Sequence, residues 1–157
     1  MNRNLIFAFV LLATLFMVNA VPYVHLKRKE KVTFEHCKVQ GNPELITVQV
    51  SPNPPVSNES EQFYVSGVLE NGAITAYETV LEIRFIFNGV PLINDYVQEF
   101  TESFPAGEPF QITALKVPTP KKLPESYEIE VIIGNPIPIQ EELIKILGCA
   151  SADVNNT

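Results

Sequence analysis

The chain has 157 residues, of which 46% are hydrophobic, and its formal net charge is −7 at pH 7. That length suits a single domain with a sizeable core. An acidic surface repels phosphate groups, and the sequence shows no basic groove interleaved with aromatic residues, so nucleic acid is not an expected partner.

Residues 1–20 have the layout of a secretory signal peptide. Arg3 precedes an apolar run, and Val18-Asn19-Ala20 forms a small-residue cleavage pattern at the end of that run. The run is short for a membrane span, although an N-terminal anchor helix is the alternative interpretation. We therefore expect an exported protein that is secreted or held in a vacuole-like or lysosome-like lumen.

Residues 21–31 form a basic arm or a pro-segment ahead of the first predicted strand. Lys27-Arg28-Lys29 could belong to a solvated arm, contact an anionic membrane surface, or mark a dibasic processing site. A solvated arm is the simplest interpretation, and the sequence does not choose between the other two.

Two further features fit the export route. Cys37 and Cys149 lie near opposite ends of the mature chain, and an even pair in an oxidising compartment favours one disulfide, with two free thiols as the alternative. Asn58-Glu59-Ser60 is a glycosylation sequon in a polar stretch, which makes Asn58 a candidate glycosylation site.

Strand patterns dominate the residues after the arm. Alternating or β-rich stretches occur at 32–38, 45–51, 61–70, 76–87, 90–100, 109–117 and 126–134. Asn88-Gly89 closes the longest of them and is a strong hairpin signal. We therefore expect 90–100 to return antiparallel to 76–87.

The segment 139–150 fits two patterns. Its apolar residues from Ile139 to Leu147 would share one face of a helix, whereas alternate residues from Leu143 to Cys149 would share one face of a strand. We favour a strand from about Leu143, because Cys149 must reach the first predicted strand in an otherwise β chain.

Seven or eight short strands, with turn signals between them and thirteen prolines, predict an all-β fold. We expect a two-sheet antiparallel, immunoglobulin-like β-sandwich over residues 32–150, followed by a tail at 151–157. An immunoglobulin domain itself does not fit, because the chain has no tryptophan and its cysteines bracket the domain. Proline cannot donate to a sheet ladder, so the stretch Ser51–Pro55, "SPNPP", is expected to carry the chain from one sheet to the other.

Alternation separates an apolar face from a charged face in the longest strands. Aromatic and branched residues gather on one face, whereas Glu82, Arg84, Glu128 and Glu130 fall on the other and are expected to face solvent. A packed core and a cavity for an apolar ligand between the sheets give the same pattern, because filling and lining residues look alike.

The sequence gives no support for catalytic chemistry, so we do not expect an enzyme, a metal site or a cofactor. His25 and His36 are the histidines, no serine lies in a nucleophile-elbow context, and no glycine-rich loop precedes a helix. The pair His36-Cys37 would need a thiolate, and a cysteine with a disulfide partner has none to offer.

Three stretches and the terminal Cys149 are similar to a known family. The stretches are "LITVQVSPNPPV" (45–56), "FYVSGVLENG" (63–72) and "FQITALKVPTPKKLPESYEIEVII" (110–133). They resemble the ML lipid-recognition domain family, and most closely the fungal phosphatidylglycerol/phosphatidylinositol transfer proteins. The resemblance covers most of residues 34–150, and its sharpest element is the Ser51–Pro55 motif. The family's bridge from first to last strand maps onto Cys37 and Cys149, whereas the further disulfides of many members are missing.

The resemblance implies a secreted sandwich that holds a phospholipid, sterol or fatty acid between its sheets and transfers it between membranes through transient contact with their surfaces. We expect a monomer. The residues that would line the lipid cavity are Phe63, Val65, Leu81, Ile83, Phe85, Phe87, Phe110, Ile112, Val117, Leu123, Tyr127, Ile129 and Val131.

The entrance of the cavity would lie at residues 117–124. Lys116, Lys121 and Lys122 form a basic cluster there, which either is solvated or attracts anionic headgroups. A second hypothesis is a secreted interaction module or effector that recognises a protein receptor.

Overall fold

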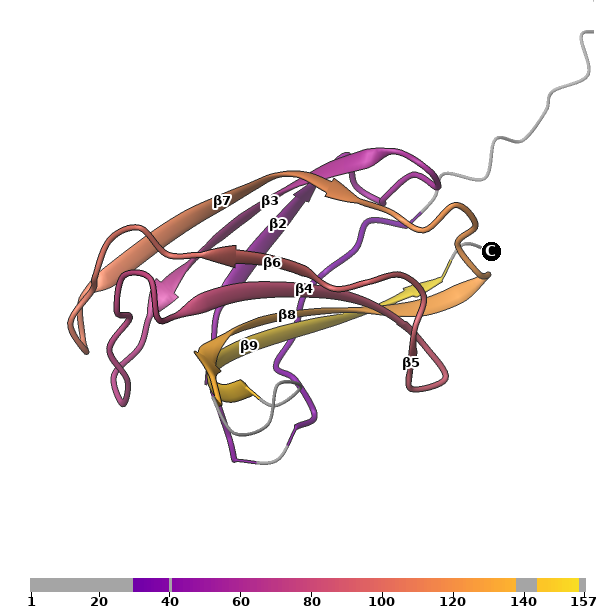
Figure 1. Cartoon of the computed structure of the whole chain (residues 1–157). Helices are drawn as coiled ribbons and strands as arrows, with labels where there is room; N and C mark the ends of the chain where they lie inside the picture. The colour runs from indigo at the N-terminus through magenta and orange to yellow at the C-terminus, as the bar shows by residue number, and fades with distance from the viewer. Residues whose placement is uncertain (1–29, 40, 138–143, 156–157) are drawn as a thin grey trace, which may run out of the picture.

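A computed structural model describes residues 30–39, 41–137 and 144–155, which fold into strands and connecting loops without a helix (Figure 1). The predicted signal peptide and residues 21–29 of the predicted arm lie outside this part of the chain. No helix that could cross a membrane occurs among the described residues. The strands are β1 (Glu44–Leu45), β2 (Thr47–Ser51), β3 (Ser60–Val68), β4 (Val80–Phe87), β5 (Val90–Pro91), β6 (Tyr96–Glu99), β7 (Pro109–Pro118), β8 (Ser126–Pro136) and β9 (Ile144–Asn155).

The strands form two sheets that pack face to face (Figure 1). The six-stranded sheet has the order β1-β9-β8-β4-β5, with β6 also paired to β4, and the three-stranded sheet has the order β2-β3-β7. Every pairing is antiparallel except that of β1 with β9. The predicted all-β, two-sheet sandwich is confirmed.

Most predicted strands are present with shifted ends. The ambiguous segment is a strand from Ile144, as we expected, and it continues to Asn155 through residues that we had assigned to the tail. The prediction for 32–38 is wrong, because that segment forms only an isolated bridge between Glu35 and Ser151 at the rim of the six-stranded sheet.

The long strand begins four residues later than the predicted 76–87. Thr79 donates its amide to the Thr75 carbonyl and accepts the Thr75 amide on its hydroxyl, which closes a turn. Tyr77 lies inside this turn at φ 63 and is 70% exposed. A turn closed by Thr75 and Thr79 therefore precedes the strand, which begins at Val80.

The predicted hairpin at Asn88-Gly89 is confirmed. Both residues have positive φ, 52 for the asparagine and 77 for the glycine, as a tight two-residue turn requires. Phe87 pairs with Val90 across the turn, and β6 then continues antiparallel to β4.

The proline stretch does not cross between the sheets, so that prediction is wrong. It joins β2 to β3, which are antiparallel neighbours in the three-stranded sheet, with Ser51 opposite Gln62. Proline has no backbone amide to donate to a sheet ladder, but a hairpin loop needs no such donors. The proline stretch is therefore as compatible with a hairpin loop as with a crossing between sheets. The chain changes sheet at Ile46 instead, between β1 and β2.

Cys37 and Cys149 form the predicted disulfide, with Cα atoms 5.8 Å apart. Both are buried against Ile132, on the face of the six-stranded sheet that points away from the sandwich interior. A buried disulfide is compatible with a secreted or lumenal protein.

Glu82 and Glu130 were expected to face solvent and are instead buried, each 8% exposed. The disulfide lies beside the Glu130 carboxylate and covers it, and Arg84 lies between the two acids. The Arg84 Nε donates to Glu82 Oε1 at 2.8 Å, and its guanidinium also reaches Glu130 at 3.4 Å and Asp95 at 3.4 Å. Burial raises the pKa of Glu82 and of Glu130, against the lowering effect of Arg84 on both.

Replacing both cysteines by alanine is expected to lower the free energy of unfolding by about 2–5 kcal/mol, because the bridge closes a loop of 112 residues. Urea unfolding followed by circular dichroism measures this change, with the reduced wild type as a matched comparison. An unchanged unfolding midpoint would contradict the prediction.

Candidate functional site: the sandwich interior and its open edge

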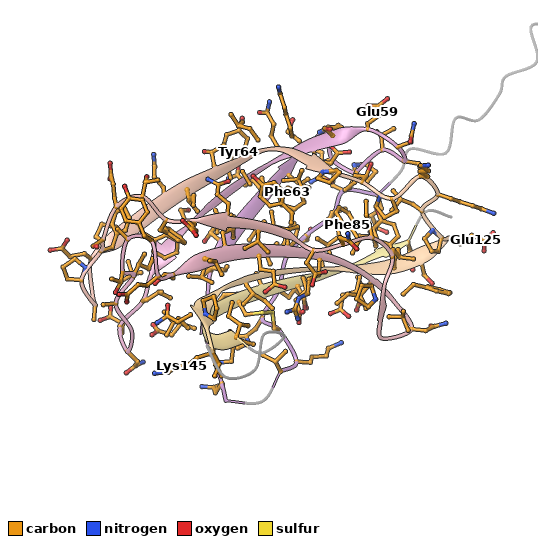
Figure 2. The ribbon with its side chains drawn as sticks, viewed as in Figure 1. Glu59, Phe63, Tyr64, Phe85, Glu125 and Lys145 are labelled. Atoms are coloured by element: carbon orange, nitrogen blue, oxygen red, sulfur yellow. A yellow bond between two sulfur atoms is a disulfide. The ribbon has the colours of Figure 1, made fainter. Side chains whose placement is uncertain are left out.

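The interior is apolar on both sides. Figure 2 shows Phe63 of the three-stranded sheet and Phe85 of the six-stranded sheet pointing into the space between the sheets, while Tyr64 points out from the opposite face. Ten of the predicted lining residues are buried: Phe63, Val65, Leu81, Ile83, Phe85, Phe110, Val117, Tyr127, Ile129 and Val131.

The remaining three predicted lining residues are less enclosed. Ile112 and Leu123 are partly buried and pack against the core. Phe87 is 39% exposed, because it is the last residue of β4 and adjoins the turn at Asn88. These side chains pack against one another, and the described part of the chain shows no cavity lined by them.

One end of the interior is closed by aromatic rings. Phe100 and Phe110 lie with ring centroids 6.1 Å apart in an edge-to-face arrangement, and Phe104 contacts both at 6.3–6.4 Å. Such pairs add to the stabilisation from burial. This end is therefore a fixed apolar wall.

The opposite end carries a buried carboxyl group. Glu61 lies on the inner face of β3, one alternation before Phe63, and its exposure is 0%. Its Oε1 accepts the Val56 amide at 2.8 Å, whereas its Oε2 is buried and has no hydrogen-bond partner among the described residues. Burial raises the pKa of Glu61, the Val56 amide lowers it, and the nearby Glu59 charge raises it further.

Thr119 fixes the loops at this end. Its hydroxyl donates to the Val56 carbonyl at 2.6 Å, lies 2.9 Å from the Glu59 carbonyl, and accepts the Glu59 amide at 3.0 Å. The backbone amide of Thr119 also donates to the Glu59 carbonyl. The carbonyls around Glu61 are thus already occupied.

A segment that we call the strap, residues 30–38, crosses the edge of the sandwich between β2 and β9 and leaves grooves beside it. On the β9 side Glu35 and Ser151 exchange two backbone hydrogen bonds, of 2.7 and 2.8 Å. On the β2 side the backbone of Val32 donates to Asn53 Oδ1 at 2.7 Å and accepts from Asn53 Nδ2 at 3.1 Å.

Hollows lie on both sides of the strap. A groove of about 510 Å³ separates it from β2, and one of about 310 Å³ separates it from the end of β9. The wider groove is lined in part by Ile46, Val48 and Val50, which belong to the core. Phe34 of the strap also lines it and packs edge-to-face on Phe63. The open edge therefore leads directly to the interior side chains.

The predicted basic cluster lies at the same end as Glu61. Lys116, Lys121 and Lys122 are all exposed, and Lys116 has φ 60 at the point where β7 departs from strict alternation. None of the three makes an ion pair with another described residue. They leave a positive rim beside the loops of an otherwise acidic chain.

Two parts of this arrangement were missed from the sequence. Glu61 has the same strand parity as Phe63 and Val65, a signal that would have placed it inside. Asn53 gave no signal beyond its place in the proline stretch, because the segment that it binds lies 21 residues away.

Cys37, Glu130 and Cys149 bring their ligand atoms within 4.8 Å of one another, as a metal site would. Both sulfurs are consumed by the disulfide, so they offer no thiolate to a metal.

Comparison with protein-family models and with curated proteins finds no match for this chain.

Glu61→Gln is expected to change how stability depends on pH. Because the pKa of Glu61 is raised on folding, the native state holds a proton that the unfolded state has already lost above the ordinary value of 4.5. Wild-type stability should therefore fall as pH rises from about 4.5 through the raised pKa, and the neutral glutamine, which can still bond the Val56 amide, should remove that decline.

Chemical denaturation across pH 3.5–8 measures this difference. The stability advantage of Glu61→Gln over wild type should grow with pH, and the exposed neighbour variant Glu59→Gln should show a smaller change. Parallel curves for Glu61→Gln and wild type would contradict the assignment.

Proposed function

We propose that this chain is a secreted or lumenal lipid-binding protein that carries a phospholipid or sterol between membranes, as its resemblance to the ML lipid-recognition family suggests. The observation that supports it best is the open edge, where a groove of about 510 Å³ reaches the core residues Ile46, Val48 and Val50. A fully closed sandwich would offer no such approach to its interior.

The driving force would be burial of apolar surface. Each CH₂ group moved from water into an apolar interior contributes about 0.8 kcal/mol, so an acyl chain of a dozen carbons could support micromolar binding after its ordering costs. The ligand would have to separate the interior side chains of the two sheets, because they belong to one packed core. The edge at the strap is where the ligand would enter, since the strap is held to the three-stranded sheet there by two hydrogen bonds with Asn53 and by the packing of Val32 and Phe34.

The lysine rim would serve the membrane step. Lys116, Lys121 and Lys122 are exposed beside the loops at the Glu61 end, and each lysine near an anionic surface contributes about 1 kcal/mol. The rest of the acidic chain would be repelled, so this end would face the membrane during transfer.

An alternative is an interaction module for a protein receptor, and the outer face of the three-stranded sheet favours it. Its strands carry mostly uncharged residues, with Tyr64 46% and Leu115 56% exposed, and Lys116 is the exposed charged residue among them. Further residues of this face include Thr47, Gln49, Gln62, Ser66, Gln111 and Thr113. Depletion of charge with exposed aromatic residues is typical of the centre of a protein interface.

Native mass spectrometry of the protein purified from a secretory host should show a stoichiometric adduct of one lipid class, identified after organic extraction. The delipidated protein should regain that adduct from mixed liposomes. A clean apo mass with no uptake would sink the carrier proposal, and co-purification of a receptor in that case would favour the interaction module.

Asn53→Ala is expected to speed transfer of a fluorescent lipid between vesicles by a few-fold, because it removes both hydrogen bonds that hold Val32. The loss of these two bonds should cost about 1–2 kcal/mol of stability without unfolding the chain. Asn94→Ala, at an exposed asparagine between β5 and β6, is the matched control. Equal transfer rates for Asn53→Ala and wild type would exclude the strap as the barrier.

A further inference from the structure

The interior of the sandwich has two unlike ends. Phe100, Phe104 and Phe110 wall one end, while Glu61 points into the other with one carboxyl oxygen bonded to the Val56 amide and the second left without a partner among the described residues. An elongated ligand in this space would therefore meet apolar rings at one end and an acceptor oxygen at the other.

The hydrogen bond that Glu61 accepts from the Val56 amide does not require a carboxyl group. A glutamine could accept the same Val56 amide without placing an acid in the interior, and a buried polar atom without a partner costs stability. No ion pair with a described cation compensates it, and Glu59 adds a like charge nearby. The unpartnered Oε2 therefore lowers the stability of the ligand-free fold, and a ligand that donates a hydrogen bond to it would restore that stability.

We propose that Glu61 Oε2 accepts a hydrogen bond from the hydroxyl group of the bound lipid, so that the site selects lipids that end in an alcohol. This inference rests on the proposed carrier function and assigns its ligand class. The body of such a lipid would lie along Phe63 and Val65, with its far end toward the three phenylalanine rings.

The donor count at the site favours an alcohol over other headgroups. Among the described residues Oε2 is the acceptor without a partner at this end, because Thr119 already bonds the neighbouring carbonyls of Val56 and Glu59. A hydroxyl has a single donor, which Oε2 can satisfy, whereas a buried ammonium group has three donors and the two lone pairs of Oε2 would leave at least one of them unpaired. A phosphate or carboxylate anion would meet the acids Glu59 and Glu61.

The test compares lipids that differ only in the donor. Wild type and Glu61→Gln are titrated with 1-hexadecanol and with its methyl ether, and then with cholesterol and with cholesterol methyl ether, by displacement of a bound fluorescent fatty-acid probe. Glu59→Gln is the matched control, because it removes the neighbouring charge and leaves the interior carboxyl.

Wild type and Glu59→Gln should bind at least one alcohol about tenfold or more tightly than its ether, as expected for a hydrogen bond to a carboxyl group. Glu61→Gln should lose that preference, because its amide nitrogen takes the place of the acceptor and can donate to the ether oxygen. A preference for hexadecanol over its ether would identify the ligand as a straight-chain alcohol, and a preference for cholesterol over its ether would identify it as a sterol.

Equal binding of alcohol and ether by wild type would overturn the inference and leave the carrier function intact. A preference that survives in Glu61→Gln would overturn it as well. Binding of the fatty-acid probe without displacement by either alcohol would overturn the inference alone, whereas failure of wild type to bind the probe, either alcohol or phospholipid would overturn the carrier function as well. The ratio of alcohol affinity to ether affinity is measured on wild type alone, so it tests the inference even if Glu61→Gln folds poorly.

Discussion

The Cys37–Cys149 disulfide fixes the strap to β9, and the features of the open edge depend on that attachment. The strap contains Cys37, bridges Ser151 through Glu35, and contacts the three-stranded sheet through hydrogen bonds with Asn53 and through the packing of Val32 and Phe34. In the proposed transfer the strap would separate from the three-stranded sheet by breaking these contacts, while Ile46 would keep the two sheets joined between β1 and β2. Opening would then be local, since the ladders within each sheet stay paired.

The same anchor explains the charges on the outer face of the six-stranded sheet. The disulfide covers Glu130, and Arg84 bonds to Glu82 and Glu130, so these acids are satisfied inside a charged network. Glu61 on the inner face is different, because only one of its oxygens is bonded. Of these buried acids, Glu61 is therefore the one whose chemistry points toward a ligand.

The features that the sequence predicted correctly are those that depend on residues close together in the chain. Period-two alternation placed Phe63, Val65 and Phe85 inside, and Asn88-Gly89 predicted its hairpin, because both effects are local. The disulfide was predicted from the cysteine count together with the predicted export signal, and it is present.

The sequence predictions that failed concern contacts between segments that lie far apart in the chain. The partner of β3 is decided by long-range packing, so the proline stretch was assigned to a crossing when it is a hairpin loop. Glu130 is buried beside a disulfide whose first cysteine, Cys37, lies far earlier in the chain. The bond between Val32 and Asn53 is of the same kind, and alternation contains no information about it.

The most direct test of the account is whether an acyl chain enters between the sheets. The chain has no tryptophan, so Phe63→Trp introduces a single interior fluorophore, and Tyr64→Trp places the same fluorophore on the outer face as its control. A lipid brominated at mid-chain should strongly quench the fluorescence of the Phe63→Trp variant and leave that of the Tyr64→Trp variant nearly unchanged. Quenching in the Tyr64→Trp variant alone, or in neither variant, would contradict a ligand held between the sheets.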